Sequence, residues 1–149
     1  MPRYQFQLET LRKLRLQERD ARSVKLAEAF RAEEILLERC AEVKDEIVTL
    51  RQQQQEIVVS QSPDVAQLLE SQRYQASLET QVRTMRDQAA TLQQEIERRR
   101  LALVEADREV RVLDKLDERR FAEYQLAAQR AEAKVLDEVG TNMVGGERQ

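Results

Sequence analysis

Apolar residues recur along two long stretches of the chain at alternating steps of three and four. In the later stretch the series comprises Leu78, Val82, Met85, Ala89, Leu92 and Ile96, and after Arg99 it resumes with Leu103, Ala106, Val110 and Leu113. In the earlier stretch it comprises Ala29, Leu36, Cys40, Val43, Ile47 and Leu50, interrupted by Glu33. Such heptads are typical of coiled-coil helices, which bury one stripe of side chains against a partner.

The boundaries of these helices follow from the few glycines and prolines. Between Arg3 and Val139 the chain has no glycine and one proline, Pro63. Because proline suits the first turn of a helix and Ser62 can cap free amides there, a second helix is expected to start at this point. We predict helices over about 3–60 and 63–139, with a turn at 60–63. Gly140 is expected to close the second helix, which leaves 140–149 as a flexible tail.

A chain that folds back at residues 60–63 pairs its two stripes in antiparallel fashion. This places Ile47 near Leu78, Val43 near Val82, and Cys40 near Met85. Arg99 falls on the same seam, near Leu26, where its stem can pack while its head reaches water. The predicted fold is therefore all-α, a single antiparallel coiled-coil hairpin.

Towards the N-terminus the leucines of the first helix change phase by one residue. They follow the series Leu8, Leu11, Leu14 and Ala21. A stutter-like change of this kind locally alters the winding of a coiled coil. We expect these residues to form the seam opposite Leu116, Leu113, Val110 and Leu103, so that the hairpin closes to its base.

A second apolar stripe lies beside the main seam of the first helix. It consists of Ala27, Phe30, Leu37, Ala41 and Val48. Two interpretations remain open, because the stripe either widens the core of a two-helix hairpin or receives a further helix.

The two helices are predicted to have unequal lengths. Counted from the turn, the first helix is exhausted opposite about residue 121, so some twenty residues of the second helix overhang. These carry an apolar face of Phe121, Tyr124, Ala128, Ala131, Val135 and Val139. Isolated helices of this length are marginal in water. We expect the overhang to dock into another protein; the alternatives are that it frays or pairs with itself in a dimer.

Composition supports a rod over a rounded core. Of the 149 residues 36% are charged and only 4% are aromatic, and the net charge is −3. This balance gives no general attraction to nucleic acid or anionic lipid. The N-terminal residues lack the apolar core of a signal peptide, and no window approaches the roughly 20 apolar residues of a membrane span. We expect a cytosolic protein without direct membrane insertion. The single cysteine, Cys40, excludes an internal disulfide.

The sequence offers little for catalysis or nucleotide binding. It contains no histidine, the usual general base and zinc ligand, and no glycine-rich phosphate loop. We predict no enzyme activity, cofactor or metal site. The one tight basic run is Arg98-Arg99-Arg100, which has acidic neighbours and lacks the interleaved aromatic residues of single-strand binders. Nucleic-acid binding is therefore not expected.

The ends of the chain resemble a known family. The opening Tyr4-Gln5-Phe6-Gln7-Leu8 continues as Glu9-Thr10-Leu11-Arg12-Lys13-Leu14-Arg15, and this run resembles the start of the flagellar FliJ family, which reads aromatic-x-Leu-x-x-Leu-x-x-Leu-Arg. The later run Leu113-Asp114-Lys115-Leu116-Asp117-Glu118-Arg119-Arg120, followed by Glu123-Tyr124, also resembles that family. The resemblance spans almost the whole chain.

The resemblance implies a soluble stalk of the flagellar type III export apparatus, peripherally associated with the membrane-embedded machinery. Its implied partners are the hexameric export ATPase, the cytoplasmic domain of the export gate, and substrate chaperones. The ATPase-contact candidates are Phe6, Leu8, Phe121, Tyr124, Ala128 and Val135. The gate-contact candidates are Tyr74, Leu78, Gln81 and Met85, although Gln81 and Met85 depart from the family pattern of a small residue and a histidine. Packing of Leu78 against Ile47 is the competing interpretation at that position.

Two other functions fit the same hairpin. One is the equivalent stalk of an injectisome type III secretion system. The other is a generic structural coiled coil, such as a scaffold or a self-associating hairpin.

Overall fold

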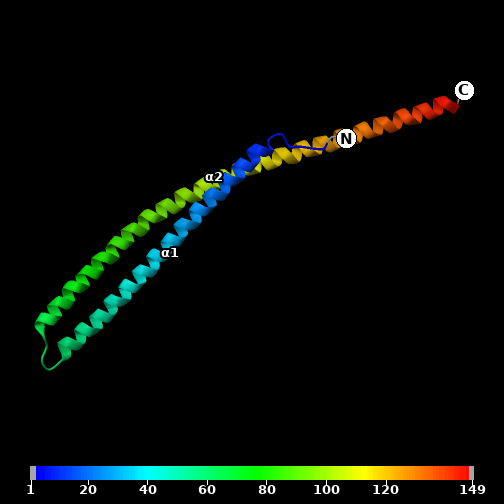
Figure 1. Cartoon of the computed structure of the whole chain (residues 1–149). Coiled ribbons are helices and arrows are strands. Elements are labelled where there is room, and N and C mark those ends of the chain that lie inside the picture. Colours follow the sequence, from blue (N-terminus) through cyan, green and yellow to red (C-terminus); the bar gives the residue numbers. More distant parts are fainter. Residues whose placement is uncertain (1–2, 148–149) are drawn as a thin grey trace. The chain divides into compact units, whose positions relative to one another are not determined.

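Two α-helices account for nearly all of the structure, a computed structural model that describes residues 3–147. Helix α1 spans Glu9–Val59 and helix α2 spans Val65–Glu147. They form two units, which we describe separately: unit 1 consists of residues 3–20 and 104–147, and unit 2 of residues 21–103. In each unit α1 and α2 run antiparallel (Figure 1). The all-α hairpin predicted from the heptads is confirmed.

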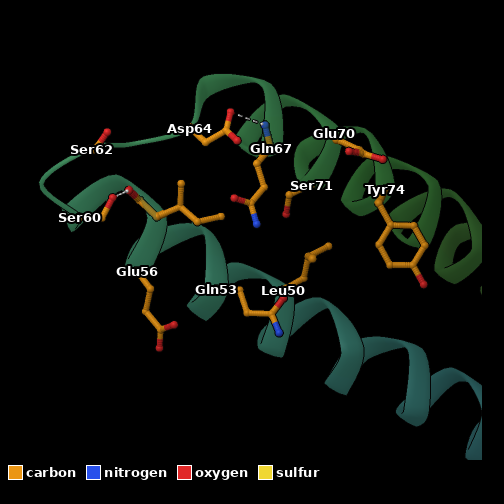
Figure 2. Close-up of a pocket in the computed structure, with 11 residues that line it drawn as sticks. Leu50, Gln53, Glu56, Ser60, Ser62, Asp64, Gln67, Glu70, Ser71 and Tyr74 are labelled. Carbon is orange, nitrogen blue, oxygen red and sulfur yellow. Dashed lines mark hydrogen bonds between the residues drawn. The ribbon is translucent and has the colours of Figure 1, made fainter.

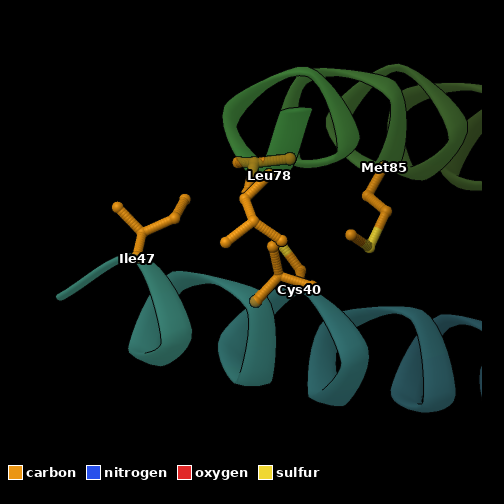
Figure 3. Close-up of a cluster of buried hydrophobic side chains, with 6 residues drawn as sticks. Cys40, Ile47, Leu78 and Met85 are labelled. Carbon is orange, nitrogen blue, oxygen red and sulfur yellow. The ribbon is translucent and has the colours of Figure 1, made fainter. Parts of the chain in front are cut away.

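Unit 2 contains the main core of the hairpin. Cys40, Val43 and Ile47 from α1 pack against α2 (Figure 3), and Leu36 and Leu50 flank them. Their buried partners on α2 are Leu78, Val82 and Met85. The six residues come from the predicted seams, with Val43 1% and Leu78 2% exposed. Removing such a stripe from water is the main source of stability for long helices.

The turn between the helices differs in detail from the predicted one. Asp64, and not Ser62, caps α2: its Oδ1 accepts a hydrogen bond from the backbone amide of Gln67 at 3.2 Å (Figure 2). A carboxylate suits this position, because it satisfies a free amide and complements the positive end of the helix. At the end of α1 the Ser60 hydroxyl donates to the carbonyl of Ile57 at 2.8 Å.

The helix ends also differ from prediction. Residues 3–8 lie outside α1, which starts at Glu9, and the carbonyl of Phe6 accepts the Glu9 amide at 3.1 Å. At the other end α2 continues through Gly140, Gly145 and Gly146, so the predicted closure at Gly140 is wrong. None of these glycines has a positive φ, hence the left-handed closing conformation does not form. Residues 148 and 149 of the predicted tail lie outside the described range.

Neither helix, over the residues that the structure describes, contains a stretch apolar enough to cross a bilayer.

Candidate interaction surfaces

An aromatic cluster joins the N-terminal segment of unit 1 to α2. The ring of Tyr4 lies 5.2 Å from that of Phe121 and 5.5 Å from that of Tyr124, measured between centroids. The guanidinium of Arg120 stands 5.8 Å from the ring centroid of Phe6, within cation–π range. Phe6 is buried, so it helps to fix the segment on α2.

The Tyr4 hydroxyl is tied to α2 as well. It donates a hydrogen bond to Oδ1 of Asp117 at 2.6 Å. Partial burial, followed by this hydrogen bond and the negative charge of Asp117, raises the pKa of Tyr4 to about 12. The segment before α1 is thus held on α2 by ring packing and by one charge-assisted hydrogen bond.

Arginines, and not leucines, occupy the seam of α1 in unit 1. Arg12 Nε lies 2.7 Å from Asp114 Oδ1, Arg15 Nε lies 3.6 Å from Glu109 Oε2, and the Arg19 Nη1 lies 3.9 Å from Asp107 Oδ1. All three arginines are half-buried. Unit 2 begins in the same way, because Arg22 donates to the carbonyl of Ala102 at 2.9 Å.

The predicted change of phase near the N-terminus is therefore wrong. Leu11, Leu14 and Ala21 are exposed, Leu14 to 50%. Half-buried and buried residues of α1 continue the spacing of the main seam as Arg12, Arg15, Arg19, Arg22, Leu26 and Ala29, and the half-buried Leu8, just before the helix, keeps the same spacing. Opposite them on α2, Ala106 and Val110 are buried. The aliphatic stems of the arginines therefore cover this part of α2, while their heads pair with its acidic residues.

From Phe121 onwards, α2 exposes an apolar surface. Phe121 is exposed and Ala128 half-buried, while every described side chain from 131 to 146 is exposed. The large apolar members are Leu126, Val135, Leu136, Val139, Met143 and Val144. We call this set, together with Phe121, the C-terminal apolar surface. It shares Phe121, Val135 and Val139 with the overhanging face predicted from the sequence, and it extends past Gly140.

The four gate-contact candidates divide between surface and core. Leu78 and Met85 are buried in the main core, where they meet α1. Tyr74 is 48% exposed, its hydroxyl donates to Glu46 Oε1, and Gln81 is exposed. The hydrogen bond to Glu46 raises the pKa of Tyr74, with partial burial adding to it. Tyr74 also borders a hollow of about 810 Å³ near the turn (Figure 2).

The seam also contains an arginine in unit 2. Arg99 Nη1 donates to the carbonyl of Lys25 at 2.6 Å, and its Nε pairs with Glu95 at 2.9 Å. This agrees with the predicted place of Arg99 near Leu26. Its hydrogen bond lowers the pKa of Glu95.

A comparison with known protein families identifies the chain that forms these surfaces. Residues 4–149 match the family described as flagellar FliJ protein. The chain belongs to the FliJ family. It is therefore associated with flagellar type III export, and its family is a non-enzymatic part of that apparatus. None of the curated proteins and none of the solved structures matches the chain.

The match to a flagellar family favours the flagellar system over the injectisome counterpart. It says nothing of individual contact residues, so those candidates rest on the surfaces described above. The sequence interpretation missed the arginine seam, although the signal was present: Arg12, Arg15, Arg19 and Arg22 have the four-three spacing of the main seam.

Proposed function

We propose that this chain is a stalk-like coiled coil of the flagellar export apparatus. It binds the hexameric export ATPase through unit 1 and the cytoplasmic domain of the export gate through unit 2, and thereby promotes export of flagellar proteins. It contributes no chemistry of its own and acts by holding partners together. The observation that carries the proposal is the C-terminal apolar surface, which is too extensive for a helix without a partner.

The ATPase contact uses α2 from Phe121 onwards. Phe121 and Tyr124 are anchored from one side by Tyr4, which fixes the start of the surface. Val135 and Ala128 continue it along the helix. Phe6 and Leu8 act indirectly, because Phe6 is buried and Leu8 is half-buried. Aromatic anchors next to an aliphatic surface are common at the centres of protein interfaces.

Two double variants test this contact. Val135→Glu with Val139→Glu places charges in the apolar surface, and we expect about tenfold or greater loss of affinity for the purified ATPase. Gln125→Glu with Gln129→Glu adds the same charge at exposed polar positions of the same helix and should leave affinity within about twofold. Stimulation of ATP hydrolysis should follow binding.

Removal of residues 121–149 is the stronger test. If the truncated chain still bound the ATPase with the affinity of the intact chain, the proposed contact would be wrong. Light scattering addresses the scaffold alternative. A concentration-dependent dimer that disappears on truncation would assign the C-terminal apolar surface to self-association.

The gate contact uses the exposed side chains Tyr74 and Gln81. Leu78 and Met85 support this part of α2 from the core, since their side chains are turned to α1. Tyr74→Ala is expected to weaken binding of the gate's cytoplasmic domain by about tenfold, as is usual for an interface aromatic residue. Leu101→Ala, at a similarly exposed position of α2, is the control and should have little effect. Unchanged gate affinity in Tyr74→Ala would contradict the assignment.

A further inference from the structure

The second apolar stripe of α1 has no cover within unit 2. Phe30, Leu37 and Val48 are each about half exposed, and Ala27 and Ala41 are exposed as well. Widening of the two-helix core, one of the two interpretations of this stripe, would have buried them. From Ala27 to Val48 the stripe extends about 32 Å at 1.5 Å per residue. Its members are spaced as on one face of a coiled-coil helix, so they fit another helix better than a strand or loop.

One end of this stripe lies in a basic groove between α1 and α2. Its floor contains Ile47, Val48 and Val82, and its volume is about 450 Å³. The charged residues that line it are Lys44, Arg51, Glu79, Arg83 and Arg86. Four positive side chains and one negative side chain give a net charge of +3 (4 − 1), in a chain whose overall charge is −3.

Most of this positive charge is not neutralised. Arg51 pairs with Glu79 at 3.3 Å, and Arg83 donates to the Thr80 hydroxyl at 3.1 Å. Within the described residues, Lys44, Arg83 and Arg86 form no ion pair with a carboxylate. The surroundings favour negative charge: a hydrogen bond from Gln75, aided by Arg51 and Arg83, lowers the pKa of Glu79.

The opposite side of unit 2 provides a contrast. The hollow there, of about 980 Å³, is lined by two positive and two negative side chains, a net charge of zero (2 − 2): Arg39, Arg98, Asp87 and Glu95. Both arginines are paired, Arg39 with Glu42 at 3.3 Å and Arg98 with Glu95 at 2.9 Å. An apolar stripe next to unneutralised positive charge thus occurs on one side of the hairpin and not on the other.

We propose that the second apolar stripe and the basic groove together receive an acidic amphipathic helix of another protein. Its apolar face covers Phe30, Leu37 and Val48, and its carboxylates pair with Lys44, Arg83 and Arg86. The resulting three-helix arrangement buries the exposed stripe and neutralises the groove, which gives both affinity and electrostatic steering. This surface is distinct from the two proposed above, and its test does not depend on them.

The test uses the full chain and a fluorescent helical peptide of about three heptads, with leucine at the seam positions and glutamate beside them. Fluorescence anisotropy should show binding that weakens with added salt. A peptide with lysine in place of glutamate should bind about tenfold more weakly or not at all. Equal binding of the two peptides would overturn the proposal.

Two matched charge reversals locate the contact. Arg83→Glu with Arg86→Glu should weaken binding of the acidic peptide by about tenfold or more, because attraction becomes repulsion. Arg39→Glu with Arg98→Glu, on the opposite side, should change it by no more than about twofold. Equal losses in both double variants would contradict the proposal.

A photocrosslinking residue adds a positional test. Leu37 and Ile35 are 55% and 52% exposed, on opposite sides of α1. A crosslinker in place of Leu37 should capture the acidic peptide, and one in place of Ile35 should not. The reverse pattern overturns the assignment. Light scattering of the chain alone provides a second way to overturn it. A dimer that the Arg83→Glu, Arg86→Glu double variant abolishes would show that the surface binds a second copy of the chain.

Discussion

An arginine at the seam of a coiled coil needs apolar contacts for its aliphatic stem and polar partners for its guanidinium head. The stems of Arg12, Arg15 and Arg19 cover buried apolar residues of α2, and their heads reach acidic side chains beside the seam. These acids lie on α2 at positions that flank its core residues, such as Asp114 next to Leu113. Because arginine is weakly hydrated and always charged, it tolerates such a place better than lysine. The hairpin is therefore closed in unit 1 without an apolar seam on α1.

A titration of Tyr4 tests the attachment of the N-terminal segment. Its pKa of about 12 lies above the ordinary value of 10.0, so the stabilising contribution is complete below about pH 10 and is lost as pH rises through about 12. NMR of ¹³C-labelled tyrosine, with Tyr4→Phe used to assign the signal, should follow this ionisation directly.

Asp117→Ala separates the causes of that shift. It removes the hydrogen bond and the negative charge, so the pKa of Tyr4 should fall towards 10 but stay above it, because partial burial remains. Asp20→Ala removes an acid of the same unit that has no contact with Tyr4 and serves as the control. An unchanged pKa in Asp117→Ala would show that the hydrogen bond does not form in solution.

At the scale of one helix, position within the heptad decides what a side chain contributes. Val43 and Val48 are the same residue type on α1, yet they are 1% and 52% exposed. Val43→Ala should lower the free energy of unfolding by about 2 kcal/mol, because it removes buried methyl groups and leaves a cavity. Val48→Ala should be neutral or slightly stabilising, since alanine favours helix. Urea unfolding followed by circular dichroism measures both; equal effects would contradict the observed register.

Heptad counting predicted the pairing of the helices correctly where the core positions of both helices are apolar. The pairing of Cys40, Val43 and Ile47 with α2 followed from heptad counting alone. The phase near the N-terminus did not, because leucine was assumed to be inside and arginine outside. The residues 8, 12, 15, 19 and 22 keep one spacing whatever their polarity, since a regular helix pair cannot shift its phase without distortion. The predicted end of the second helix at Gly140 was also wrong, because glycine permits a helix to end but does not require it.

The arginine seam leads to a prediction for α1. Replacing Arg12, Arg15 and Arg19 together by leucine should slow hydrogen exchange of amides 9–20, because partly exposed ion pairs contribute at most about 1 kcal/mol each and buried leucine about 2. Replacing the same three by alanine should speed it, since the covering stems are lost. Arg31→Leu with Arg39→Leu, at exposed positions, is the control. Faster exchange in the leucine variant would mean that the ion pairs hold the helices together.

For the molecule as a whole, some apolar side chains are buried in a core within the chain and others are exposed and available to partners. The main core lies in unit 2, whereas the C-terminal apolar surface of α2 has no described neighbour on α1. A helix that depends on its own hydrogen bonds opens readily, because nucleation is costly and packing provides most of its stability. The proposed stalk should therefore gain order where it meets the ATPase.

This coupling can be measured in the intact chain. Amides of residues 131–146 should exchange with solvent at least about tenfold faster than those near Val43, and addition of the export ATPase should slow them. Amides near Val43 provide the internal control, because the core already protects them and binding should not change their rate. Protection of 131–146 in the free chain, at the level of the core, would show that this helix is stable alone. Its apolar side chains would then form a rigid preformed docking surface, and binding would lack the large negative heat-capacity change expected when folding accompanies association.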